Sequence, residues 1–196
     1  MDTARIADQI STDGFATIGD AFSPPLIGAL RRSCTEGEGF VSAAVGRGAG
    51  RASRSGVRGD VIKWLDDANE IDDEYLAVME SLRTALNERL YLGLFDYECH
   101  YAIYDTGMKY AKHSDVLQGT HARLLSTVTY LNDSWTAANG GELVLYRGSD
   151  PTRLASILPQ PGLLVVFLSE EFPHEVLTAN KPRHSIAGWF RGRAGD

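Results

Sequence analysis

LLVVFLSEEFPHEVLTANKPRHSIAGWFR, residues 163–191, contains three short runs rich in β-branched and aromatic residues. We expect strands at 163–168, 174–178 and 183–191, because such residues fit a pleated, half-buried surface. No helical pattern separates these runs. Consecutive short strands without helices between them are typical of an antiparallel sandwich or barrel.

The same β-rich texture begins after Leu94 and continues to the end of the chain. Turn residues separate the runs at Asn139-Gly140-Gly141 and at Pro161-Gly162. Further strands are expected at 96–104, 124–131, 142–147 and 154–157. The pattern predicts a mainly β fold with supporting helices, and the number of strands fits a double-stranded β-helix, the jelly-roll form.

The first third of the chain has a different pattern, which predicts the supporting helices. The strongest helix is expected at 72–91, where apolar residues recur at helical spacing. Two shorter helices are expected at 2–11 and from the N-cap Ser23 to about Ser33, with strands at 14–18 and 60–64. We expect a single domain over 1–196, in which 1–94 support a β-barrel core at 95–191.

Composition excludes several classes of function. A net charge of −7 and a pI near 5.2 argue against a nucleic-acid or anionic-membrane partner, because both need a basic surface. Cys34 and Cys99 are far apart and are expected to be reduced, buried thiols. Residues 1–15 lack the pattern of a signal peptide, and no apolar run reaches the roughly 18 residues of a membrane span. We expect a cytoplasmic enzyme.

His113-Ser114-Asp115, followed 59 residues later by His174, is the strongest candidate for a metal site. Two imidazoles and one carboxylate form the facial triad of non-haem Fe(II) oxygenases, which leaves three metal positions open. One intervening residue lets His113 and Asp115 project to the same side of an extended segment. Any single histidine is more often a hydrogen-bonded structural group, but the set in this order favours a metal site.

Arg183, nine residues after His174, could grip a dicarboxylate co-substrate at two points. The keto-acid end of 2-oxoglutarate would occupy two metal positions and O2 the third. The distal carboxylate would be buried and would need a paired donor, which Arg183 with the Tyr130 hydroxyl could supply. Tyr130 ends an alternating run whose members are expected to line one interior face, namely Leu124, Ser126, Val128 and Tyr130.

Three other histidines are left out of the expected metal site. His184 follows Arg183 directly and therefore points to the opposite face of its strand. His121 falls in an expected loop. His100 could approach the pocket from its strand, but it has no partner at ligand spacing.

Residues 41–59, VSAAVGRGAGRASRSGVRG, contain five glycines and four arginines and no acid. Such a mixture is typical of a solvated, flexible loop. The alternative is a mobile lid that orders over a bound substrate and uses arginine to grip acidic or carbonyl groups. The strand expected directly afterwards favours a lid anchored at the mouth of the barrel.

Several motifs together resemble the 2-oxoglutarate- and Fe(II)-dependent prolyl hydroxylases, specifically the oxygen-sensing prolyl hydroxylase domain branch and its bacterial relatives. The resemblance covers roughly residues 14–191. Besides the triad, it rests on Arg58-Gly59-Asp60-Val61-Ile62-Lys63-Trp64, on Tyr104 and Tyr110 around Gly107, on Arg123 and Tyr130-Leu131-Asn132-Asp133-Ser134-Trp135, on Gly140-Gly141-Glu142-Leu143, and on His174-Glu175-Val176 through Arg183 to Trp189-Phe190.

The resemblance implies a role for each matching residue. It implies that His113, Asp115 and His174 bind iron, that Arg183 and Tyr130 hold the distal carboxylate of 2-oxoglutarate, and that Tyr104 lies near its metal-bound end. It further implies that Arg123, Tyr110, Trp189, Asp60 and Arg58 shape the pocket for the hydroxylated residue. The cofactors implied are Fe(II), 2-oxoglutarate and O2, with ascorbate as a further candidate. The implied partner is a protein carrying the target proline, and elongation factor Tu is one candidate by resemblance alone.

The sequence departs from the family pattern in three places. The turn between Tyr104 and His113 is one residue shorter, the 41–59 loop has its own sequence, and the sequence ends without the C-terminal helix of larger relatives. Two alternatives to a protein prolyl hydroxylase therefore stay open. One is the same chemistry on a free amino acid or small metabolite, and the other is a non-catalytic iron-binding sensor or interaction module. A nucleic-acid demethylase fits the acidic chain poorly.

Overall fold

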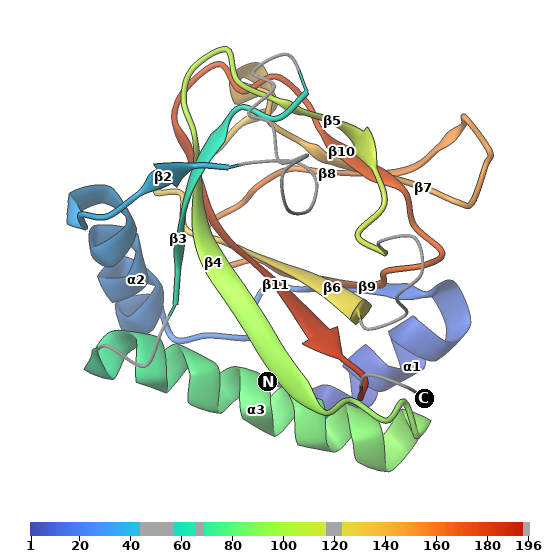
Figure 1. Cartoon of the computed structure of the whole chain (residues 1–196). Coiled ribbons are helices and arrows are strands. Elements are labelled where there is room, and N and C mark those ends of the chain that lie inside the picture. Colours follow the sequence, from blue (N-terminus) through green and yellow to red (C-terminus); the bar gives the residue numbers. More distant parts are fainter. Residues whose placement is uncertain (44–56, 66–68, 117–122, 194–196) are drawn as a thin grey trace.

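Two antiparallel sheets form the core of the computed structural model, which describes residues 1–43, 57–65, 69–116 and 123–193 (Figure 1). The larger sheet has seven strands in the order β1-β9-β6-β11-β4-β3-β2, and the smaller has four in the order β5-β10-β7-β8. The larger sheet contains β1 (Phe15–Ile18), β2 (Val41–Ser42), β3 (Asp60–Trp64), β4 (Asp96–Tyr104), β6 (Arg123–Tyr130), β9 (Leu164–Leu168) and β11 (Arg183–Arg191). The smaller sheet contains β5 (Tyr110–His113), β7 (Leu143–Tyr146), β8 (Arg153–Ile157) and β10 (His174–Val176).

Three helices cover the outer face of the larger sheet, on the side away from the smaller sheet (Figure 1). They are α1 (Thr3–Asp13), α2 (Pro24–Glu36) and α3 (Glu70–Leu90), and a 3-10 turn, η2, spans Ala137–Asn139. Each helix begins where the sequence supplies a cap: the side chains of Asp2, Ser23 and Asn69 accept hydrogen bonds from the first backbone N–H groups. The helices thereby brace one side of the sheet and leave its other side for a site.

The core is divided by the larger sheet into two clusters. The outer cluster joins the helices to the sheet through side chains such as Tyr75, Leu82, Ile186 and Phe190. The inner cluster lies between the two sheets and includes Leu145, Val165, Phe167 and Phe172. Alternation along β11 supplies both sides, since Ile186 and Phe190 belong to the outer cluster while Arg183, Ser185, Ala187 and Trp189 face the inner space.

The fold class predicted from the sequence is confirmed, and the expected strands and helices are present with ends that agree or differ by at most three residues. Two short strands, β2 and β5, extend the prediction. One expectation was wrong. Leu124 packs against the outer cluster instead of lining the interior, because the pairing register of β11 with β6 shifts between Phe190 and Arg191 and breaks the alternation there.

The loop expected at 41–59 is described only at its two ends, and residues 44–56 lie outside the described residues. The expected lid therefore stays a prediction. Among the described residues, none of the helices is long and apolar enough to cross a membrane. Cys34 and Cys99 are both free and buried, as expected.

Candidate metal centre

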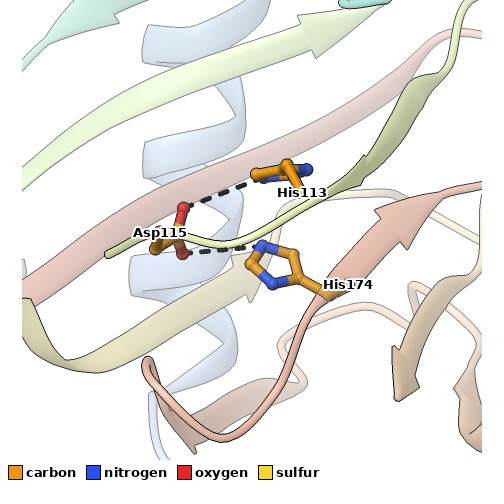
Figure 2. A group of neighbouring side chains, drawn as sticks. All are labelled: His113, Asp115 and His174. Atoms are coloured by element: carbon orange, nitrogen blue, oxygen red, sulfur yellow. Dashed lines mark ion pairs between the residues drawn. The ribbon is translucent and has the colours of Figure 1, made fainter. Parts of the chain in front are cut away.

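His113, Asp115 and His174 converge at one place although 59 residues separate the first pair from the third (Figure 2). His113 ends β5, and His174 opens β10 directly opposite it in the pairing register. The Nε2 atoms of His113 and His174 lie 3.7 and 3.5 Å from the two carboxylate oxygens of Asp115. The three ligand atoms lie within 4.8 Å of one another, which is a spacing that one metal ion can bridge.

Backbone carbonyls orient both imidazoles. His113 Nδ1 lies 2.9 Å from the Ala111 carbonyl oxygen, and His174 Nδ1 lies 3.0 Å from the Phe172 carbonyl oxygen. A carbonyl oxygen can only accept, so each Nδ1 donates to its carbonyl, and this bond turns each Nε2 toward the metal position. Asp115 is held in turn by the Ser126 hydroxyl, which donates to its Oδ2 at 2.7 Å.

The charges of the three groups suit a divalent cation. Burial, and then the neighbouring His174, lower the pKa of His113 to about 3, so this imidazole is neutral at physiological pH. Burial alone would raise the pKa of Asp115, but His174, His113 and the Ser126 hydroxyl outweigh this effect and lower the pKa from 3.8 to about 2. Two imidazoles and one carboxylate are the donor set of an Fe(II) facial triad.

A cavity of about 490 Å³ lies between the two sheets and includes the triad in its wall. Arg183 reaches this cavity from β11 and is 1% exposed. Its Nε donates to the Gly141 carbonyl at 2.9 Å and its Nη1 to the Ser185 hydroxyl at 3.1 Å, and among the described residues no carboxylate pairs with it. A buried guanidinium that meets only neutral acceptors favours the binding of an anion.

The rings of Tyr104 and Tyr130 flank this guanidinium, with their centroids 5.2 and 5.0 Å from Arg183 Cζ. The Tyr130 hydroxyl is buried and has no hydrogen-bond partner among the described residues. Burial raises the pKa of both phenols, so each keeps its proton and can donate. The deep end of the cavity thus combines a fixed positive charge with a phenol that has no acceptor, which fits a carboxylate.

Arg58, Asp60 and Tyr110 form one wall of the cavity. Arg58 donates to both oxygens of Asp60, from Nε at 2.7 Å and from Nη2 at 2.9 Å. Tyr110 stacks on His113 with ring centroids 3.6 Å apart and carries the Arg58 guanidinium 4.8 Å above its own ring. This wall therefore extends from the metal position outward as a stack of planar groups.

Arg123 and Trp189 form another part of the cavity wall. The Arg123 guanidinium lies 3.6 Å above the centre of the Trp189 ring system, and it donates to Glu98 from Nε and from Nη2. The eleven residues to which the family resemblance gives a role thus all lie in or beside one cavity. Their individual roles stay predictions.

Sequence reasoning missed several members of the site. Phe167 packs edge-on to His174, and the interior position of Ser126 was expected while its bond to Asp115 was not. His100 was rightly kept out of the triad, yet it lines the cavity between Trp64 and Trp189. His184 lies outside the cavity lining, as expected. His121 lies outside the described residues.

Comparison with known proteins agrees with this geometry. A model of the 2OG-Fe(II) oxygenase superfamily matches residues 99–191. A solved prolyl-4-hydroxylase from Pseudomonas putida is 38% identical, with a TM-score of 0.87, over 97% of this chain and 99% of that one. A prolyl hydroxylase from Trichoplax adhaerens, solved with a peptide fragment of the hypoxia inducible factor oxygen degradation domain, is 25% identical, with a TM-score of 0.82, over 96% of this chain and 88% of that one.

A prolyl 3,4-dihydroxylase from Ostreococcus tauri is 38% identical over 111 residues, which are 50% of this chain and 21% of that protein. The chain spans about a fifth of the length of the curated relatives it matches. The family and the triad imply Fe(II) and 2-oxoglutarate as cofactor and co-substrate. The chain belongs to the 2OG-Fe(II) oxygenase superfamily and is similar to its prolyl hydroxylases.

Proposed function

We propose that this protein is a 2-oxoglutarate- and Fe(II)-dependent dioxygenase that hydroxylates a prolyl residue in a protein substrate and releases succinate and CO2. The observation that carries the proposal is the pairing, within one cavity, of the triad with a buried guanidinium that has no carboxylate partner among the described residues. One group suits the metal and the other suits the far end of a dicarboxylate.

In this proposal His113, Asp115 and His174 hold Fe(II), which supplies O2 activation coupled to the decarboxylation of 2-oxoglutarate. The Arg183 guanidinium and the Tyr130 hydroxyl bind the distal carboxylate, and Tyr104 packs against the co-substrate from the β4 side. The apolar lining, which includes Leu143, Phe167 and Val176, excludes water from the reacting groups.

A peptide substrate is favoured over a free amino acid by the state of the two arginines on the cavity walls. Arg58 is already paired with Asp60 and Arg123 with Glu98. Neither is an uncompensated cation that a substrate carboxylate could claim, whereas both can still donate hydrogen bonds to neutral carbonyls. The similarity to the Trichoplax enzyme solved with a peptide supports the same choice.

Purified protein loaded with Fe(II) and supplied with 2-oxoglutarate and O2 tests the proposal directly. We expect proline-containing peptides to gain one oxygen atom by mass spectrometry, with one succinate formed for each hydroxylation. His113→Ala and Asp115→Ala should abolish both products, while His184→Ala, on the other face of β11, should retain activity within about twofold.

Two other outcomes would redirect the assignment. Oxidation of a free amino acid or metabolite with every peptide unchanged would favour a small-molecule oxygenase. Failure of a fully metallated sample to bind 2-oxoglutarate would favour a non-catalytic module. Elongation factor Tu as substrate, ascorbate as a cofactor, a cytoplasmic location and a single domain over 1–196 stay predictions.

A further inference from the structure

Glu98 lies outside the triad and outside the 2-oxoglutarate end of the cavity, yet it contacts a residue of the cavity wall. It sits on β4, directly opposite Trp189 of β11 in the pairing register. Opposed residues of antiparallel strands project from the same face, so Glu98 reaches the same wall as Trp189. Its Oε1 accepts from Arg123 Nε at 3.1 Å and from Arg123 Nη2 at 2.8 Å.

Glu98 is itself fixed from the opposite side. Its Oε2 accepts from Arg191 Nη1 at 2.8 Å, and Arg191 donates to both oxygens of Asp96 at 2.8 and 2.6 Å. The row therefore runs Asp96, Arg191, Glu98, Arg123 across three neighbouring strands. Two arginines and two carboxylates alternate in sign, so the row carries no net charge.

The row ends at the cavity wall on an aromatic surface. Arg123 Cζ lies 3.6 Å from the centre of the Trp189 ring system, and both residues line the cavity. An arginine side chain without such restraints samples many rotamers and loses conformational entropy when a ligand fixes it. With Nε and Nη2 held by Glu98 and one face held by Trp189, Arg123 is fixed before any ligand arrives, and its Nη1 makes no hydrogen bond to a described residue.

We propose that Glu98 is a positioning residue, which holds Arg123 flat on Trp189 so that its Nη1 can donate to a backbone carbonyl of the peptide beside the target proline. This inference rests on the proposed function for its ligand. Because Glu98 also neutralises Arg123, the wall selects a neutral carbonyl over an acidic side chain. Glu98→Ala would free the guanidinium to move and would expose its charge.

The first test does not depend on catalysis. In a sample with Zn(II), a diamagnetic ion, in place of Fe(II), the NMR signal of the Arg123 Nε–H should be shifted by the Trp189 ring current. Glu98→Ala should move this signal to the position typical of exposed arginines, whereas Glu98→Gln, which keeps an acceptor oxygen, should move it only part of the way. An unchanged signal in Glu98→Ala would overturn the positioning role.

The second test measures peptide hydroxylation. Glu98→Ala should raise the KM for a neutral proline-containing peptide about tenfold with little change in kcat, and Glu98→Gln should recover part of this loss. For a peptide with an acidic residue beside the proline, the penalty should be smaller. A fall in kcat with an unchanged KM, or equal penalties for both peptides, would contradict the inference.

Glu80→Ala is the matched control. Glu80 also binds an arginine through both of its oxygens, at 2.7 and 2.6 Å, but it does so on α3. Glu80→Ala removes the same charge as Glu98→Ala, and it should leave the peptide KM and the Arg123 NMR signal unchanged. A wild-type protein that hydroxylates no peptide would refute the proposed function, while the NMR test would still decide whether Glu98 positions Arg123.

Discussion

Tyr130 and Tyr75 are both fully buried tyrosines, but their hydroxyl groups are treated differently by the fold. The Tyr75 hydroxyl lies 3.0 Å from Thr129 Oγ1 and 3.2 Å from the Tyr97 hydroxyl. The Tyr130 hydroxyl has no partner among the described residues and lies beside Arg183. A buried polar group without a partner costs about 1–3 kcal/mol, so the Tyr130 hydroxyl is retained at a cost in stability.

This contrast predicts opposite effects for one chemical change. Tyr130→Phe should leave the free energy of unfolding unchanged or slightly raised without 2-oxoglutarate, and it should raise the KM for 2-oxoglutarate about tenfold because a charge-assisted hydrogen bond is lost. Tyr75→Phe should lower the free energy of unfolding by about 1 kcal/mol with or without the co-substrate. Thermal unfolding with and without 2-oxoglutarate measures the stability of both variants, and the rate of succinate formation at several 2-oxoglutarate concentrations measures the KM. Destabilisation of the unliganded Tyr130→Phe variant would show that this hydroxyl serves the fold instead.

His100 is a second buried polar side chain in the cavity wall, 2% exposed and packed edge-on to Trp64. Burial, and then the positive charge of Arg58, lower its pKa from 6.5 to about 4, although Asp60 opposes the shift. Between pH 6.5 and about pH 4, His100 therefore binds a proton in the unfolded chain but not in the folded chain. Protonation of the unfolded chain lowers the free energy of unfolding, so stability is unaffected by His100 above pH 6.5 and decreases as the pH falls toward 4.

His100→Gln should remove this part of the pH dependence. Between pH 6.5 and pH 4, the free energy of unfolding of the wild type should fall more than that of the variant, by up to about 3 kcal/mol. Urea unfolding at several pH values measures the difference, in which the other titrating groups cancel. Parallel pH profiles for the two proteins would mean that His100 titrates normally in the folded state.

At the scale of the elements, Gly188 shows how closely the outer face of β11 is packed. A Cβ at this position would lie 2.6 Å from Tyr97 Cζ and 2.8 Å from Cys99 Cβ, both on the neighbouring strand β4. Gly28 in α2 differs, since a Cβ there would meet only the end of the Arg32 side chain at 3.8 Å.

Alanine should therefore have opposite effects at the two glycines. Gly188→Ala should lower the free energy of unfolding by about 1–3 kcal/mol through overpacking. Gly28→Ala should raise it by about 0.5–1 kcal/mol, because glycine is a poor helix former and the added methyl has room. Chemical denaturation measures both changes. Equal effects at the two sites would show that the ring of Tyr97 can move aside.

Elements with strong local patterns could be predicted from the sequence, and the others could not. The helical spacing of apolar residues predicts α3, and the alternation of residues facing opposite sides predicts β11. β5 has only four residues, and its position at an edge of the smaller sheet depends on pairing with β10, more than 60 residues away. The wrong placement of Leu124 follows from an irregularity in β6, where Leu124 has no partner because Phe190 pairs with Leu125 and Arg191 with Arg123. The sequence of β6 gives no sign of it.

The site divides along the same line. The triad and Arg183 could be singled out as candidates because metal and carboxylate chemistry restricts both residue type and order, and the structure brings them to one cavity. Glu98 could not, since a glutamate in a strand is uninformative until its neighbours in space are known. The position of His100 in the cavity wall was open for the same reason.

At the scale of the whole molecule, the residues proposed to bind the metal and 2-oxoglutarate come from both sheets. The triad belongs to β5, β10 and the segment after β5, whereas Arg183 and Tyr130 belong to the larger sheet. A metal ion and 2-oxoglutarate bound together would therefore connect the two layers, and removal of the metal should weaken that connection.

Loading with metal and co-substrate should raise the Tm. At concentrations 100-fold above the dissociation constants, each ligand adds about 2.7 kcal/mol, which corresponds to about 5–10 °C for a chain of this size. Differential scanning calorimetry measures the shift, which chelation should reverse. His113→Ala should show little of it. A wild-type Tm that metal and 2-oxoglutarate leave unchanged would argue against this cofactor site.

The division of labour along β11 also has a consequence for how this protein can change over evolution or under engineering. The odd-numbered residues from Arg183 to Trp189 line the cavity, while Ile186 and Phe190 pack in the apolar cluster beneath the helices. Insertion or deletion of a single amino acid within this strand would exchange the two sets of side chains. An arginine side chain would then be buried in the apolar core beneath the helices, and an isoleucine would face the cavity. Substitutions can accumulate on either side independently, but the length of this segment is fixed.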